Sequence, residues 1–250
     1  MPTILLLQVG HTYESVAQTR GDYDAWFTRA LAVPGLSVQC VPIHQGAQVP
    51  DTWDFAGVVV TGSFAMVTDH APWSEACAAY LRSAFVRNLP ILGVCYGHQL
   101  LAYALGGEVI DNPQGRHAGT AHVSTTHAAR TDALFGALPE ALVVQVSHMQ
   151  HVARLPEQAV HLAFADGDPH QAFRVGERAW GVQFHPEFDA FVARSYIEIR
   201  RPIIAGEGTD VDALLARVED SDHGARLLTR FAEIARGSRG LGASGHNVFG

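Results

Sequence analysis

Cys95 stands in a sequence context that is typical of a nucleophile. The segment LGVCYGHQ, residues 92–99, runs from an apolar strand-like stretch through G-x-C-x-G into a helix-like stretch. Small residues on both sides permit the sharp turn of a nucleophile elbow, here with sulfur in place of oxygen. A helix N-terminus favours the thiolate form of a cysteine placed there, and the thiolate is the reactive form. The pattern predicts that Cys95 attacks an electrophilic carbon.

The other two cysteines give no such signal. Cys40 and Cys77 lie in apolar surroundings without flanking glycines, which is typical of inert buried thiols. Three cysteines are an odd number, and no C-x-x-C pair occurs. A disulfide framework is therefore not expected, and a reducing, cytoplasmic setting is predicted.

A thiolate nucleophile needs a base, and His185 is the best placed of the 14 histidines. It lies in GVQFHPEF, residues 181–188, where an apolar strand-like stretch ends in His-Pro-Glu. A spacing of two in extended chain puts His185 and Glu187 on the same side. Glu187 could then orient the imidazole, as the third member of a triad does. The alternative for this segment is a surface turn without a catalytic role.

A third segment could stabilise an oxyanion. Residues 58–64, VVVTGSF, indicate a buried strand that enters a glycine-containing turn. The backbone N–H of Gly62 or Ser63, together with that of Tyr96, could donate to a tetrahedral oxyanion. Such turns end many parallel strands, so this signal depends on the other two.

Strand-like and helix-like stretches alternate through the first part of the chain. Expected strands cover residues 3–9, 36–43, 55–60 and 91–94, and expected helices cover 22–32, 72–87 and 98–105. This alternation predicts an α/β fold with a mostly parallel central sheet and helices on both faces. Open sheets of this kind place their sites at the carboxyl ends of the strands, where Cys95 would lie.

The middle and the end of the chain differ from this pattern. Strands expected at 121–125, 142–146, 159–165, 171–175 and 179–184 follow one another through short turns. They predict antiparallel additions that extend one sheet edge or form a small second sheet. Helices are expected over 188–204, 211–218 and 223–235. We therefore predict a single domain over residues 1–236, with a helical C-terminal part over 188–236, and a flexible tail over the glycine-rich residues 237–250.

Composition excludes several function classes. The 250 residues are 48% hydrophobic and carry a net charge of −8 without a basic stripe, which argues against a nucleic-acid partner. The apolar stretch after the N-terminus is too short to span a membrane and lacks a basic flank, so neither a membrane anchor nor a signal peptide is expected. The histidines do not follow common zinc spacings, and neither a metal nor another cofactor is predicted.

Taken together, the motifs resemble the class I, triad-type glutamine amidotransferases, in particular the GMP-synthase-like amidotransferase domains. The matching segments are VTGSFAMVTDHAPW, GVCYGHQLLAYALGG, VVQVSHMQHV and GVQFHPEF, and their order agrees with that family over about residues 3–235. The resemblance implies a three-layer, flavodoxin-like fold. It implies that Cys95 forms a γ-glutamyl thioester, that His185 moves the proton and that Glu187 orients His185. It also places Gln99, Ser147 and His148 beside glutamine.

Two positions depart from the family pattern, and the end of the chain differs as well. Phe64 stands where the oxyanion turn usually has proline. The fixed φ of proline is therefore missing, and the loop is expected to be looser. His117 stands where a glutamate is common. No ATP-pyrophosphatase domain follows in this sequence, so the chain alone is not expected to make GMP.

The sequence is compatible with several functions. The substrate is glutamine or another γ-glutamyl small molecule, hydrolysed by the chain alone or as the ammonia source of a partner synthetase. A γ-glutamyl peptidase would use the same mechanism. A non-catalytic binding or regulatory domain is a third reading, which the intact Cys95, His185 and Glu187 disfavour. The apolar stripe of residues 227, 228, 231 and 234 is expected to pack on the chain's own sheet rather than on a partner.

Overall fold

The computed structural model describes residues 1–238 of the chain. A nine-stranded sheet has the order β2-β1-β3-β4-β11-β10-β9-β6-β7, and β5 and β8 form a separate pair. The strands are β1 (Thr3–Gln8), β2 (Ser37–Pro42), β3 (Gly57–Val60), β4 (Ile91–Val94), β5 (Glu108–Asp111), β6 (His117–Thr125), β7 (Ala141–His148), β8 (Gln150–Arg154), β9 (Ala159–Ala165), β10 (Asp168–Val175) and β11 (Ala179–Val182). The predicted α/β class is confirmed, and the expected antiparallel strands extend one edge of the sheet.

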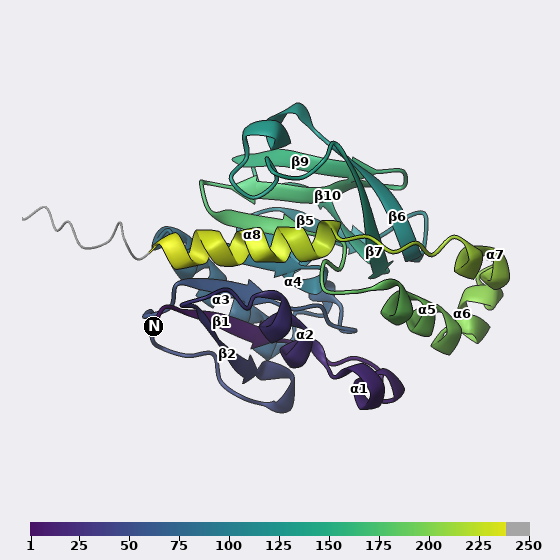
Figure 1. Ribbon diagram of the computed structural model, residues 1–250, viewed down its shortest axis with the longest axis horizontal. Helices are drawn as coiled ribbons and strands as arrows, with labels where there is room; N and C mark the ends of the chain where they lie inside the picture. Colours follow the sequence, from purple (N-terminus) through teal and green to yellow (C-terminus); the bar gives the residue numbers. More distant parts are fainter. Residues whose placement is uncertain (239–250) are drawn as a thin grey trace, which may run out of the picture.

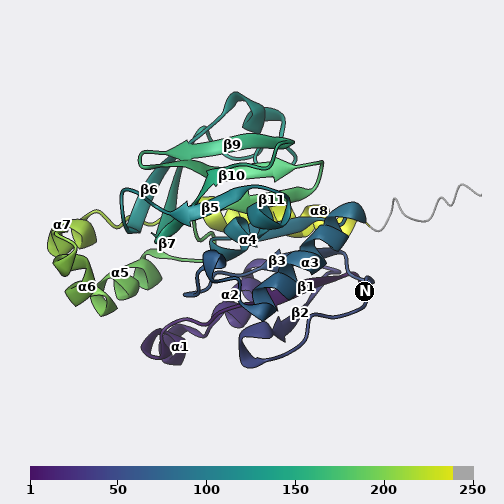
Figure 2. The same ribbon diagram turned by 180° about the vertical axis from the view of Figure 1, so that it is seen from behind.

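The helices lie on both faces of the sheet and at one side of it (Figure 1, Figure 2). They are α1 (Glu14–Arg20), α2 (Tyr23–Ala30), α3 (Pro72–Val86), α4 (Tyr96–Ala104), α5 (Ala190–Ile199), α6 (Arg201–Gly206), α7 (Val211–Ala216) and α8 (His223–Gly237). Helix α8 crosses the face seen in Figure 1, and α3 and α4 cover the face seen in Figure 2. The molecule therefore has the three layers that the sequence predicted.

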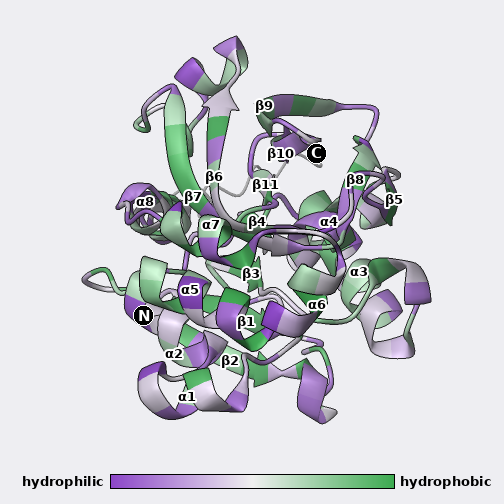
Figure 3. Cartoon of the chain, turned by 90° about the vertical axis from the view of Figure 1, so that its right-hand side faces the viewer, coloured by the Kyte–Doolittle hydropathy of each residue, from purple (hydrophilic) through white to green (hydrophobic). Residues whose placement is uncertain are grey.

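The five strands β2, β1, β3, β4 and β11 are parallel and have the flavodoxin-like order. Their side chains alternate between two cores, as a pleated strand requires. Ile4 and Leu6 pack in the core under α2 and α8, whereas Leu5 and Leu7 pack in the core under α3 and α4. Because both faces are covered, β3 and β4 are apolar throughout and appear hydrophobic in Figure 3.

The antiparallel part brings the far sheet edge back to the end of β11. Strands β10, β9, β6 and β7 continue the sheet from β11 in antiparallel fashion. The backbone N–H of His185 then donates to the carbonyl of Gln145 in β7 at 2.8 Å, as an isolated bridge. This bridge fixes the chain just after β11, and with it the direction of the His185 side chain.

Some predicted elements were wrong or incomplete. The helix expected over 188–204 is two helices, because Pro202 lies in the first turn of α6 and cannot continue the hydrogen bonding of α5. Helix α4 begins at Tyr96 rather than at residue 98. Helix α1 and the β5–β8 pair were not predicted, since their short polar stretches carry little periodicity.

The end of the described chain is helical. Helix α8 includes Gly237, the first residue of the predicted tail, and residues 239–250 lie outside the described residues. Leu227, Leu228 and Phe231 of this helix are fully buried in the core under α2 and α8, and Ile234 packs against it. The prediction that this stripe packs on the chain's own sheet is confirmed.

Candidate active site

Cys95 lies at the junction of β4 and α4 in a strained backbone conformation. Its φ is 51°, in the left-handed region that side chains other than glycine rarely adopt. It precedes the first residue of α4, and its carbonyl accepts from the N–H of Gln99 at 3.1 Å. Strain at a strand-to-helix turn is typical of functional positions, where surrounding structure maintains it. The conformation is that of a nucleophile elbow.

The two glycines beside Cys95 are required by close backbone contacts. A Cβ on Gly93 would lie 2.2 Å from the carbonyl oxygen of Gly97, and a Cβ on Gly97 would lie 2.5 Å from that of Val60. Real Cβ atoms do not approach oxygens this closely. Glycine at both positions therefore allows α4 to begin directly over the ends of β3 and β4.

His185 and Glu187 form a buried pair next to Cys95. The Nδ1 of His185 lies 2.8 Å from Oε1 of Glu187, and the two side chains are 3% and 0% exposed. The imidazole ring stacks on Phe188 with the ring centroids 4.1 Å apart. Gly62 also lies close to the ring, because an added Cβ would be 2.8 Å from Cε1 of His185. Phe188 and the turn after β3 therefore both restrict the ring.

The charges around His185 favour its protonated form. Burial by itself lowers the pKa of His185, but the charges of Glu187 and Cys95 and the side-chain hydrogen bonds to both raise it to about 10. Loss of a neighbouring negative charge should reverse part of this shift. The sulfur of Cys95 is thus accompanied by a cationic imidazole at neutral pH.

A Glu187→Gln variant tests this charge arrangement through the pH dependence of hydrolysis. The glutamine can still accept from Nδ1 but carries no charge, so the pKa of His185 falls and the imidazolium loses its proton at lower pH. We expect the basic limb of kcat/KM to move to lower pH by about 1 to 3 units. The limb should not move in Glu233→Gln, which alters an exposed pair with Arg230. An unchanged basic limb in Glu187→Gln would show that Glu187 does not control His185.

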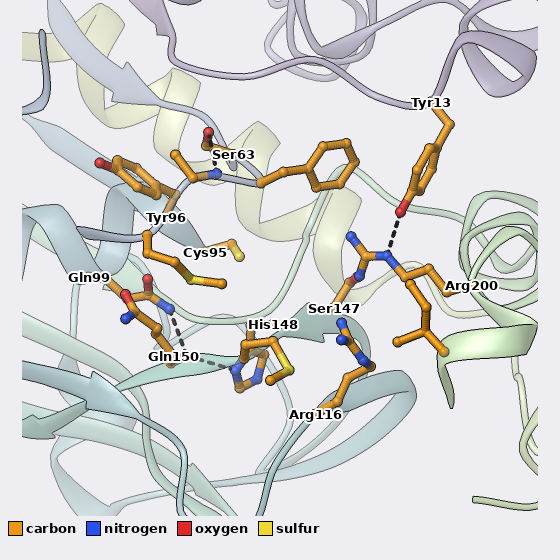
Figure 4. Close-up of a pocket in the computed structure, with 15 residues that line it drawn as sticks. Tyr13, Ser63, Cys95, Tyr96, Gln99, Arg116, Ser147, His148, Gln150 and Arg200 are labelled. Atoms are coloured by element: carbon orange, nitrogen blue, oxygen red, sulfur yellow. Dashed lines mark hydrogen bonds between the residues drawn. The ribbon is translucent and has the colours of Figure 1, made fainter. Parts of the chain in front are cut away.

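Cys95 opens into a pocket of about 270 Å³, which we call the Cys95 pocket. The predicted residues Ser63, Tyr96, Gln99, Ser147 and His148 line it (Figure 4). Gly62 does not line it but lies close to the ring of His185. Residues that the sequence analysis missed also line the pocket; these are Tyr13, Phe64, Ala65, Met66, Arg116, Met149, Gln150, Arg200 and Ile203. Phe64, Ala65, Met66, Met149 and Gln150 lie within segments that match the family, but the pattern assigned no substrate contact to them. Tyr13, Arg200 and Ile203 carry no recognisable motif.

The polar side chains that the family pattern singled out are held by neighbours. Both amide hydrogens of Gln99 are used, because Nε2 donates to the carbonyl of Gln150 at 2.7 Å and to Oε1 of Gln183 at 3.0 Å. Its Oε1 remains an acceptor at the pocket wall. His148 is 5% exposed, and burial lowers its pKa to about 4, so this imidazole is neutral. Ser147 Oγ accepts from Arg200 at 2.9 Å.

The two departures from the family pattern have different surroundings. The ring of Phe64 lies 4.9 Å from that of Tyr13 and 6.1 Å from that of Tyr196, so the turn after β3 is held by aromatic contacts. The ring of His117 lies beside that of His148 in a tilted arrangement, with the ring centroids 5.2 Å apart, and burial lowers the pKa of His117. A neutral imidazole thus occupies the place of a family carboxylate.

Buried histidines also surround Asp168, behind the pocket wall. The carboxylate is fully buried, with His148 Nε2 at 3.7 Å and His151 Nδ1 at 3.6 Å from its oxygens. Burial lowers the pKa of nearby His98 to about 3. Within residues 1–238 no group of three or more His, Cys, Asp or Glu side chains is arranged to hold a metal ion. No helix over the same residues is long and apolar enough to cross a membrane.

Solved structures with the same fold include glutamine amidotransferases. One from Thermotoga maritima superimposes with a TM-score of 0.71 at 20% identity, covering 94% of this chain and 98% of that one. One from Methylobacillus flagellatus gives a TM-score of 0.69 at 24% identity and covers 100% and 99% of the two chains. At these identities the likeness establishes the fold, and the fold predicted from the sequence is confirmed.

Sequence relatives identify the family to which the chain belongs, in addition to the fold. The glutamine amidotransferase class-I model matches residues 20–198. The glutamine-hydrolysing GMP synthase subunit from Archaeoglobus fulgidus is 31% identical over 185 residues, which is 72% of this chain and 93% of that protein. A GMP synthase from Porphyromonas gingivalis is 37% identical over 169 residues, which is 66% of this chain. The chain therefore belongs to the glutamine amidotransferase class-I family, and the enzyme class predicted from its motifs is confirmed. It spans 32% of the length of the Porphyromonas relative.

Proposed function

We propose that this chain hydrolyses the γ-glutamyl amide bond of glutamine or a related γ-glutamyl compound through a thioester on Cys95. The observation that carries the proposal is the buried His185, which interacts with Cys95 on one side and with Glu187 on the other. A strained elbow cysteine paired with an oriented imidazole is the arrangement that acyl transfer requires.

The first half of the reaction forms the thioester. The Cys95 thiolate attacks the γ-carbonyl carbon, and the carbonyl oxygen becomes an oxyanion. The backbone N–H of Tyr96, with that of Gly62 or Ser63, donates to this oxyanion. The imidazolium of His185 gives its proton to the departing nitrogen, the C–N bond breaks, and ammonia or an amine leaves.

The second half releases glutamate. Neutral His185 takes a proton from water as the water attacks the thioester carbon, and the C–S bond breaks to regenerate the Cys95 thiolate. Glu187 keeps Nδ1 hydrogen-bonded through both halves, so that Nε2 faces the reacting atoms. The Oε1 of Gln99 and the Ser147–His148 segment hold the γ-glutamyl group.

One observation favours a second candidate function, the cleavage of γ-glutamyl peptides. The Cys95 pocket continues past the catalytic residues to Tyr13, Arg200 and Ile203, so an amine larger than ammonia could occupy it. Glutamine and γ-glutamyl peptides share one mechanism here, and the preferred leaving group is a matter of pocket contacts.

We propose further that hydrolysis needs no partner synthetase. His185 is already hydrogen-bonded to Glu187 in the single chain, and the stripe of α8 is covered by the chain's own core. The purified chain should turn over glutamine or at least one member of a γ-glutamyl panel at about 1 per second or faster, measured as glutamate release. A rate orders of magnitude lower across the panel, restored by a candidate synthetase, would instead identify an ammonia-donating component of a larger enzyme.

A further inference from the structure

Arg200 is a cation in the Cys95 pocket, and no acidic residue among residues 1–238 forms an ion pair with it. It lies between α5 and α6, and its guanidinium points into the pocket from the side opposite Tyr96 and Gln99 (Figure 4). No carboxylate of residues 1–238 lies within ion-pair distance of it, whereas the other pocket arginine, Arg116, is paired with Glu207 at 3.0 Å. The positive charge of Arg200 is therefore not neutralised by the part of the chain that the structure describes.

The surroundings hold this guanidinium in one orientation. Its Nε donates to the hydroxyl of Tyr13 at 2.5 Å, and its Nη1 donates to Ser147 Oγ at 2.9 Å. The rings of Tyr13, Phe64 and Tyr196 lie 5.1 to 5.6 Å from its central carbon. Aromatic faces attract a cation but do not neutralise it. Neither N–H of Nη2 donates to any side chain or carbonyl of the described residues, so this edge remains available.

The charge of the pocket contrasts with that of the chain. The chain carries a net charge of −8, yet the described pocket lining contains Arg116 and Arg200 and no Asp or Glu. Because Arg116 is paired with Glu207, Arg200 supplies the positive charge that a ligand would encounter. A guanidinium whose Nη2 is free can donate charge-assisted hydrogen bonds to a carboxylate.

We infer that Arg200 binds a carboxylate of the substrate and so selects anionic γ-glutamyl compounds. The inference rests on the proposed function, because it places the scissile bond at Cys95. The carboxylate comes from one of two sources in such a compound: the α-carboxylate of the γ-glutamyl group, or the carboxylate of an amino acid that serves as the leaving group. Both present the same chemistry to Arg200.

Steady-state kinetics with three substrates tests the inference and distinguishes the two sources. The substrates are L-glutamine, γ-glutamylglycine and the α-amide of glutamine, compared in wild type, Arg200→Gln and Arg200→Lys. We expect Arg200→Gln to raise KM for carboxylate-bearing substrates about 10- to 100-fold, with a much smaller change in kcat. Arg200→Lys, which keeps the charge but loses the planar fork, should give a smaller rise.

The pattern across substrates identifies the carboxylate. If Arg200→Gln raises KM equally for L-glutamine and γ-glutamylglycine and leaves KM for the α-amide unchanged, Arg200 binds the α-carboxylate. If KM rises for γ-glutamylglycine alone, Arg200 binds the carboxylate of the leaving group. The matched control is Arg201→Gln. Arg201 is the next residue in the chain, but it is exposed and paired with Glu198 and Asp212, so this variant should leave all three KM values unchanged. An equal rise in KM for all three substrates, or an unchanged KM for all three, would overturn the inference.

Binding measurements keep the inference separate from the proposed function. Calorimetric titration of L-glutamine and γ-glutamylglycine into Cys95→Ala and into Cys95→Ala with Arg200→Gln gives Kd values without turnover. The second protein should bind at least one of these ligands about 10- to 100-fold more weakly, and circular dichroism should show equal helix content in both. If wild type hydrolyses no substrate, the proposed function fails, while equal Kd values in the two proteins would refute the role of Arg200.

Discussion

Replacing Cys95 with alanine is expected to lower glutamate release by at least about 10³-fold, because no thioester can form without the sulfur. Oxyanion donors and substrate binding remain, so a small residual rate is compatible with the mechanism. Helix content and the free energy of unfolding should change little, since Cys95 donates no side-chain cap to α4. The measurement is glutamate release from glutamine and from the γ-glutamyl panel.

The other cysteines supply matched controls for this substitution. Burial raises the pKa of Cys40 to about 11 and that of Cys77 to about 12, so both thiols are protonated and unreactive at neutral pH. Cys40→Ala and Cys77→Ala should keep nearly full activity, and a glutamine-like electrophile should label Cys95 alone. Hydrolysis at the wild-type rate by Cys95→Ala would refute the mechanism.

Gly93→Ala is expected to disrupt the elbow itself. The added Cβ would lie 2.2 Å from the carbonyl oxygen of Gly97, and backbone on both sides leaves no flexible side chain to move away. Overpacking of this kind destabilises by about 1–3 kcal/mol, and a displacement of Cys95 by about 1 Å lowers kcat/KM by about 10²-fold or more. Urea unfolding and kcat/KM measure the two effects.

A second glycine variant shows whether the effect belongs to the elbow. Gly206 ends α6, and no atom outside its chain neighbours and its own helix backbone lies within 4 Å of a Cβ built there. Gly206→Ala should leave kcat/KM unchanged and stabilise slightly, because alanine loses less backbone entropy in a helix. Full stability and activity in Gly93→Ala would mean that β4 and α4 tolerate a wider junction than the elbow geometry allows.

The site depends on both the parallel and the antiparallel part of the sheet. Cys95 comes from the parallel strand β4, while His185 follows β11, the last parallel strand, and is fixed by the bridge to Gln145 in the antiparallel strand β7. The antiparallel strands β10, β9, β6 and β7 thus return the chain to the carboxyl end of the parallel strands. Their role in the site is to set the position of His185 and of Ser147.

Local sequence was sufficient for the features that depend on chain neighbours. The strand, G-x-C-x-G and helix order of residues 91–104 fixes an elbow, because small residues and apolar runs are short-range requirements. The spacing of two between His185 and Glu187 likewise predicted a pair, and their 2.8 Å hydrogen bond agrees with that prediction. The alternation of elements was enough to predict the class of the fold.

Contacts between distant segments required the tertiary structure. Pro202 would have been enough to predict that residues 188–204 form two helices. The sequence could not predict that Arg200, at the break, contacts Tyr13 and Ser147. Those three residues are far apart in the sequence and share no motif. Their meeting depends on how α5 packs beside β7.

The sequence by itself therefore determined the elbow at Cys95, the His185–Glu187 pair, the fold class and the family, because each depends on local periodicity, turn chemistry or motif spacing. Only the tertiary structure decided that Arg200 has no carboxylate partner among residues 1–238, that aromatic rings hold Phe64, and that buried histidines lie around Asp168. The physical reason is that charge compensation and burial are properties of neighbours in space, and sequence spacing does not specify them across a nine-stranded sheet.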